Sequence, residues 1–183
     1  MKFLNILFVL VMAATAIGFI GREDYTYIYN ILIIGIVYFS ILYMEFKLHF
    51  KIKNYIKILL IITFILHTTF GQYINLYQKN NWFDKGLHLF GIFAFSLLFY
   101  ATITALINVN TNSKIYTFIV VSSIGITAGV YFELLEFALD ISTGSKHQHG
   151  LIDTNLDIIF NMIGAYLAGV WVVYSRNSLQ NKM

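Results

Sequence analysis

The sequence contains no cysteine and no proline, and only 11% of its 183 residues are charged. The absence of cysteine excludes disulfide bonds and thiolate metal ligands. The absence of proline removes a common cause of helix kinks, so every helix can be continuous. A soluble domain carries about 25% charged residues, so this deficit means that most of the surface faces something other than water. The net charge of +3 does not indicate a nucleic-acid partner.

Apolar residues make up 58% of the chain, and the mean hydropathy is +0.72. They form six runs, each near the roughly 20 residues that a helix needs to cross a bilayer. The runs cover residues 3–20, 27–44, 58–76, 87–107, 115–139 and 156–174. The connections are short, so neighbouring helices are expected to be antiparallel. The sequence therefore predicts an all-α polytopic membrane protein, with residues 1–183 forming a single bundle of six transmembrane helices embedded in the lipid bilayer.

Lysine and arginine in the connections predict the orientation of the chain, because they are enriched on the cytoplasmic side. With a cytoplasmic N-terminus, eight of these residues fall inside and four fall outside. The connection 45–57 contributes most of the difference. We therefore expect both termini in the cytoplasm.

Polar side chains enter the apolar runs at one end, which is the outer end in this orientation. The fourth run begins with Asp84, Lys85 and His88. The fifth run ends with Glu133, Glu136 and Asp140, and the sixth begins with Asp153, Asp157 and Asn161. Spacings of three or four residues place each set on one face of its helix. At 1.5 Å of rise per residue, Glu133 and Asn161 would lie roughly 10–12 Å below the surface, level with His67 in the third run. We expect a polar cavity open to the extracytoplasmic side, with His67 near its floor.

Several carboxylates side by side in a medium of low dielectric constant cannot all stay ionised without a cation. Ionisable residues inside spanning segments are also rare and usually functional. A divalent-metal site and a proton-carrying pair both remain open for Glu133 and Glu136. For a metal site we expect Glu133, Glu136 and Asp157 as ligands, with His88 as a fourth ligand or a general base. Oxygen ligands with one imidazole suit Mg²⁺ or Mn²⁺, and Zn²⁺ less well.

The remaining polar residues each have two interpretations. Asp84 either orients or assists His88 in catalysis or metal binding, or caps the fourth helix, and Asp153 is likewise a candidate N-cap. Lys85 is either an interfacial side chain that reaches towards water or an anchor for an anionic headgroup. His67 either lines the cavity or is a buried histidine bonded to a neighbouring helix. Small residues in the last run are expected to permit close helix packing: Gly164, Ala165, Ala168 and Gly169.

The order of these motifs resembles a known family. Asp84-Lys85-x-x-His88-Leu-Phe90, Glu133-x-x-Glu136-Phe137 and Asp153-Thr154-x-x-Asp157-x-x-x-Asn161 resemble the YjdF-like family of bacterial membrane proteins. More distantly, the first and last motifs resemble the VanZ family, whose members are linked to glycopeptide-antibiotic tolerance. Glu133-x-x-Glu136 departs from the Asp-Glu…Gln pattern of VanZ proteins. The resemblance implies six helices in the cytoplasmic (inner) membrane of a prokaryote and implies no particular activity.

Three functions are compatible with this pattern. The first is an enzyme-like or metal-binding site that acts on a lipid or cell-envelope precursor. An alternative is a proton-coupled carrier of small solutes, although the sequence shows neither the internal repeat nor the broken helices that transporters often have. The third is a structural or stress-response membrane component without catalysis, in which the polar cluster only locks three helices together.

Overall fold

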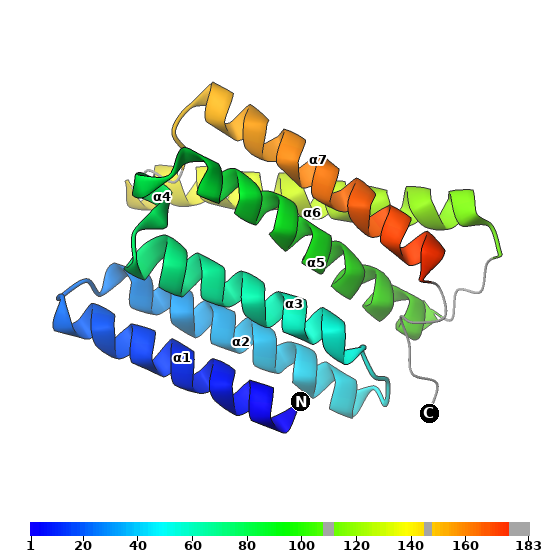
Figure 1. The fold of residues 1–183 in the computed structure, drawn as a ribbon, viewed down its shortest axis with the longest axis horizontal. Helices are drawn as coiled ribbons and strands as arrows, with labels where there is room; N and C mark the ends of the chain where they lie inside the picture. The colour runs from blue at the N-terminus through cyan, green and yellow to red at the C-terminus, as the bar shows by residue number, and fades with distance from the viewer. Residues whose placement is uncertain (108–111, 145–147, 176–183) are drawn as a thin grey trace. The chain divides into compact units, whose positions relative to one another are not determined.

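The computed structural model describes residues 1–107, 112–144 and 148–175, and these residues form helices and short connections without a strand. The helices are α1 (Lys2–Gly21), α2 (Thr26–Lys47), α3 (Asn54–Ile65), the π-helical segment η1 (Leu66–Tyr73), α4 (Leu76–Lys79), α5 (Asn81–Ile107), α6 (Lys114–Thr143) and α7 (Leu151–Tyr174) (Figure 1). Six spans within the described residues are long and apolar enough to cross a membrane, with α3 and η1 counted together. The prediction of an all-α polytopic membrane protein with six spans is therefore confirmed.

The chain divides into two compact units, the first comprising residues 1–83 and the second beginning at Asp84. The expectation that the whole chain forms a single domain stays a prediction.

The first unit is built on an aromatic core between α1, α2 and α3. The Phe8 ring centroid lies 4.9 Å from that of Tyr38 and 6.3 Å from that of Phe64. The buried Tyr38 hydroxyl donates a hydrogen bond to Asn5 Oδ1 at 2.9 Å, so its polar group is satisfied inside an apolar core. The opposite faces of α1 and α2 expose large apolar side chains, as expected of helices that contact lipid.

The third span changes from an α-helix to a π-helix at Leu66, although the sequence lacks proline. The hydroxyl of Thr68 donates to the Phe64 carbonyl at 2.8 Å, and such side-chain bonds compete with the regular helix ladder. The span ends at Tyr73, three residues before the predicted end at residue 76. Asn75 then adopts the left-handed conformation at φ 65° and begins the short α4.

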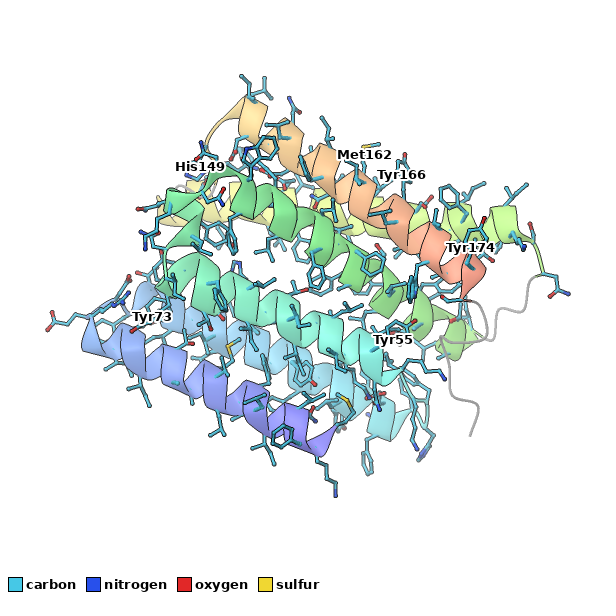
Figure 2. The ribbon with its side chains drawn as sticks, in the orientation of Figure 1. Tyr55, Tyr73, His149, Met162, Tyr166 and Tyr174 are labelled. Atoms are coloured by element: carbon cyan, nitrogen blue, oxygen red, sulfur yellow. The ribbon has the colours of Figure 1, made fainter. Side chains whose placement is uncertain are left out.

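The second unit contains α5, α6 and α7, which approach closely at small residues. A Cβ added to Gly164 would collide with the backbone carbonyl oxygen of Leu89 and lie 3.2 Å from the backbone nitrogen of Phe93. One added to Gly129 would lie 2.7 Å from the Cβ of Asn161. The expected role of the small residues of α7 in close packing is confirmed at Gly164. Further along the α6–α7 interface, Tyr166, which is labelled in Figure 2, stacks on Phe118 at 6.1 Å between ring centroids.

Candidate functional site in the second unit

Two of the three helices that carry the polar residues of the site, α5 and α7, start earlier than the hydropathy predicts. Helix α5 begins at Asn81 instead of residue 87, and α7 begins at Leu151 instead of residue 156. The Asn80 side chain accepts a hydrogen bond from the Trp82 amide at 2.9 Å, and Gly150, at φ 111°, is the N-cap of α7. The interpretation of Asp84 and Asp153 as N-caps is therefore wrong, because both lie in the first helical turn.

Lys85 on α5 is the basic centre of the site. Its side chain is only 6% exposed, and Nζ lies 2.5 Å from Asp153 Oδ1, 2.8 Å from Asp157 Oδ1 and 3.2 Å from Asp84 Oδ2. This burial leaves no exposed ammonium group for either of the two roles expected of it at the membrane surface. Lys85 instead neutralises part of a carboxylate cluster that joins α5 to α7.

His88, one turn further along α5, contacts residues of all three helices. Its Nδ1 atom lies 3.2 Å from Asn161 Oδ1 on α7 and 3.5 Å from Glu133 Oε1 on α6. Its Nε2 atom lies 3.6 Å from Asp84 Oδ1 and 3.9 Å from Asp157 Oδ1. The structure therefore brings the predicted polar faces of α5, α6 and α7 together around one imidazole.

Three buried side chains of this cluster, Glu133, Asp157 and Asn161, have polar atoms without a hydrogen-bond partner among the described residues, although Asp157 Oδ1 lies 2.8 Å from Lys85 Nζ. Glu133 is 4% exposed, and neither of its carboxylate oxygens accepts a hydrogen bond. Asn161 is 2% exposed, and its Nδ2 donates none. Buried polar groups are nearly always hydrogen-bonded, and each exception needs an explanation such as an ion or water. A cation or a hydrogen-bond donor beside His88 would satisfy Glu133, whereas the Nδ2 donor of Asn161 needs an acceptor such as water.

One atom each from Asp84, His88 and Asp157 can contact a common metal ion, because these atoms lie within 4.8 Å of one another. Two of the four predicted metal ligands, His88 and Asp157, belong to this triad, and a third, Glu133, adjoins His88. Asp84 was predicted as a catalytic residue, and the geometry makes it a possible ligand as well.

Glu136, the fourth predicted ligand, lies on α6 and is partly buried. It forms no hydrogen bond or ion pair with the described residues, so its role as a ligand stays a prediction. His67 belongs to the first unit, where Nδ1 lies 2.6 Å from the Tyr77 hydroxyl and Nε2 lies 3.1 Å from Gln72 Nε2. Its place on the floor of a common cavity also stays a prediction.

Sequence reasoning missed the connection that follows α6. The Gln148 backbone amide donates to Asp140 Oδ2 at 2.9 Å, and its side-chain amide donates to the Glu133 carbonyl at 3.1 Å. His149 follows at the start of α7 (Figure 2), where its backbone amide donates to Asp153 Oδ2 at 3.2 Å. No signal in the sequence distinguishes Gln148 from an ordinary loop residue. These bonds tie the loop to both helices beside the cluster.

A pocket of about 520 Å³ lies between the end of α6 and the start of α7. Asp140, Gln148 and Thr154 are the polar residues that line it, together with apolar residues and Gly150. Gln148 connects this pocket to Glu133 through its hydrogen bond to the carbonyl. The cluster around His88 is therefore adjacent to a hollow at the helix ends, although its own side chains do not line that hollow.

Six apolar spans with a buried cluster of charged residues define the chain as a multi-pass membrane protein. The chain belongs to the family described as predicted membrane protein (DUF2238), whose model matches residues 3–178. An uncharacterised protein of Thermotoga maritima is 31% identical over 136 residues, which cover 71% of this chain and 67% of that protein. No solved structure matches the chain. The resemblances to the YjdF-like and VanZ families stay expectations.

Proposed function

We propose that the second unit holds a divalent cation between α5, α6 and α7, with Asp84, His88 and Asp157 as ligands and Glu133 as a fourth. The observation that carries this proposal is the buried Glu133 carboxylate, which accepts no hydrogen bond from the described residues and lies 3.5 Å from His88. A carboxylate without a partner is costly inside a protein, and binding to a metal ion is one of the few ways to offset that cost.

The charge balance supports a cation. The cluster contains four carboxylates, those of Asp84, Glu133, Asp153 and Asp157, and one lysine, Lys85. Lys85 can neutralise only one of the four negative charges. A divalent ion would balance two of the remaining three.

The distances also support a cation. Two neighbouring ligands of an octahedral ion at about 2.1 Å lie about 3 Å apart. His88 Nε2 lies 3.6 Å from Asp84 Oδ1 and 3.9 Å from Asp157 Oδ1. Asp84, His88 and Asp157 would therefore have to move by less than an ångström each to share one ion at Nε2, whereas Glu133 lies beside Nδ1 and would have to turn towards that ion. Carboxylate oxygens with one imidazole favour Mn²⁺ or Mg²⁺, with Zn²⁺ next.

We propose further that this ion acts on a lipid or cell-envelope precursor that carries phosphate. Mg²⁺ and similar ions are commonly held by one or two carboxylates and complete their coordination with phosphate oxygens of the substrate. A site within membrane-spanning helices and about two turns from their ends could be reached by the headgroup of such a lipid. In this role the substrate would displace either His88 or Asp84 from the ion. The displaced residue would then be available as a general base, and the other would remain a ligand.

Thermal unfolding of the detergent-purified protein tests the cation site. The midpoint is measured first in EDTA and then with Mg²⁺, Mn²⁺, Zn²⁺ or Ca²⁺ added singly. An ion present at 100 times its dissociation constant stabilises the native state by about 2.7 kcal/mol, which raises the midpoint of a chain of this size by about 5–11 °C. The shift should disappear in Glu133→Gln and Asp157→Asn. It should persist in Glu23→Gln, which removes the same charge from an exposed residue of the first unit.

One observation favours a second candidate, a cluster that only locks the helices together. Lys85 already contacts three carboxylates and joins α5 to α7 without any ion. In that case Asp157→Asn would lower the midpoint in EDTA, and no metal would shift the midpoint of the wild type. This outcome would reject the cation site and keep the structural function.

A further inference from the structure

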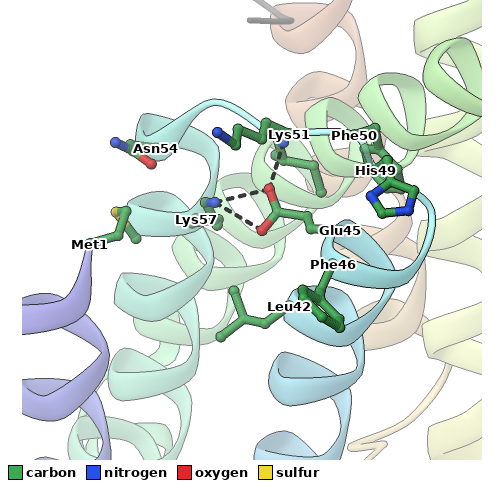
Figure 3. Close-up of a pocket in the computed structure, with 10 residues that line it drawn as sticks. Met1, Leu42, Glu45, Phe46, His49, Phe50, Lys51, Asn54 and Lys57 are labelled. Atoms are coloured by element: carbon green, nitrogen blue, oxygen red, sulfur yellow. Dashed lines mark hydrogen bonds and ion pairs between the residues drawn. The ribbon is translucent and has the colours of Figure 1, made fainter. Parts of the chain in front are cut away.

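The first unit contains a pocket of about 620 Å³ at the connection between α2 and α3, bordered by the start of α1 (Figure 3). This volume lies in the range of small-molecule sites. The apolar part of the lining includes Met1, Leu42 and Phe46, and the polar part includes Glu45, Lys51 and Lys57. The pocket lies at the ends of two membrane-spanning helices and combines a charged part with an apolar one.

Positive charge dominates this region. Residues 45–57 contain four lysines and one glutamate, a surplus of three positive charges. Lys51 is exposed and forms no hydrogen bond or ion pair with the described residues. Helix α3 begins at Asn54 with neither a side-chain cap nor an acidic residue in its first turn. The positive end of its dipole therefore adds to the attraction for an anion.

The Glu45 carboxylate does not neutralise Lys51, because it is already paired with Lys57. Both of its oxygens accept hydrogen bonds from Lys57 Nζ at 2.9 Å, and Oε1 also accepts one from the Ile52 amide at 2.6 Å (Figure 3). Lys57 is 7% exposed, so this is a buried ion pair that links the end of α2 to α3. Lys51 remains available to contact an anionic ligand.

We infer that this pocket binds the phosphate of an anionic phospholipid headgroup. Lys51 and the first turn of α3 contact the phosphate, and the apolar side chains of Leu42 and Phe46 contact the glycerol and the upper part of the acyl chains. Phe46 is 80% exposed, which suits a side chain that contacts lipid. Basic pockets between membrane helices bind lipid headgroups by this combination of charge and apolar surface.

Native mass spectrometry of the purified protein measures this binding with phosphatidylglycerol, phosphatidylcholine and inorganic phosphate as probes. We expect phosphatidylglycerol to bind with higher affinity than phosphatidylcholine. Lys51→Gln should weaken phosphatidylglycerol binding about fivefold, the contribution of one lysine near a membrane surface. Lys51→Glu should weaken it further. Lys114→Gln is the matched control, because Lys114 is also an exposed lysine at a helix start and lies outside the pocket.

Equal effects of Lys51→Gln and Lys114→Gln would overturn the inference, because they would show attraction to the overall charge instead of binding in the pocket. Binding of inorganic phosphate as tight as that of phosphatidylglycerol would overturn the assignment to a lipid. Lys51 is exposed, so its substitution leaves the buried Glu45–Lys57 pair intact and does not compromise folding. The variants of the cation site in the second unit should leave lipid binding here unchanged.

Discussion

Lys85→Met should destabilise the protein strongly in EDTA and make its stability more dependent on divalent cations. Methionine keeps the apolar stem of the lysine and removes the charge that lies within 3.2 Å of Asp84, Asp153 and Asp157. Asp157 is 2% exposed and would remain as a buried carboxylate without its main partner. Breaking a buried ion pair in this way costs about 3–5 kcal/mol. For a chain of this size the unfolding midpoint should fall by about 6–20 °C.

Differential scanning fluorimetry with EDTA and with millimolar Mn²⁺ measures both parts of this prediction. Mn²⁺ should recover part of the lost stability, since a divalent ion can neutralise the same carboxylates that Lys85 contacts. Lys114→Met is the control, because it removes an exposed lysine without a partner among the described residues. If Lys85→Met and Lys114→Met unfold at the same temperature in EDTA, the buried ion pairs of Lys85 do not stabilise the fold.

Two further substitutions test the packing that positions the sites. Gly164→Ala should lower the free energy of unfolding by about 1–3 kcal/mol, because the new methyl group collides with the backbone of Leu89. Chemical denaturation measures this loss, with Gly35→Ala as the control because its methyl group meets open space. Equal effects of the two substitutions would contradict the prediction. Glu45→Gln should lower the free energy of unfolding by about 1–3 kcal/mol, because the buried Lys57 loses its ionic partner. An unchanged denaturation midpoint would show that this pair does not stabilise the α2–α3 connection.

The number and type of the helices could be predicted from the sequence, because lipid demands long apolar helices. Their ends could not, since hydropathy marks the apolar run and not the helix itself. Asp84 and Lys85 lower the hydropathy before residue 87, yet α5 already includes both residues. The side-chain cap from Asn80 provided a sequence signal for this earlier start.

The π-helical segment after Leu66 was also not predicted. Its sequence contains Thr68, Thr69 and Gly71, which are weak helix formers. These residues indicate a weakened helix but do not determine how the ladder of backbone hydrogen bonds rearranges. That rearrangement depends on tertiary contacts, such as the one between Gly71 and the Tyr77 ring.

The spacing of polar residues predicted which helix faces carry the candidate site, and the structure brings Asp84, His88, Glu133, Asp157 and Asn161 together. The spacing could not predict how the helices rotate about their axes, because packing determines that rotation. The pairing of Lys85 with three aspartates was missed for this reason.

Equilibrium dialysis of the purified protein against Mn²⁺, with the bound metal measured by mass spectrometry, determines whether α5, α6 and α7 hold a cation. We expect one tightly bound ion per chain in the wild type and in Glu23→Gln, and loss of that ion in the double variant Glu133→Gln with Asp157→Asn. If the wild type binds no ion, or if the double variant binds as much Mn²⁺ as the wild type, the proposed cation site between α5, α6 and α7 is contradicted.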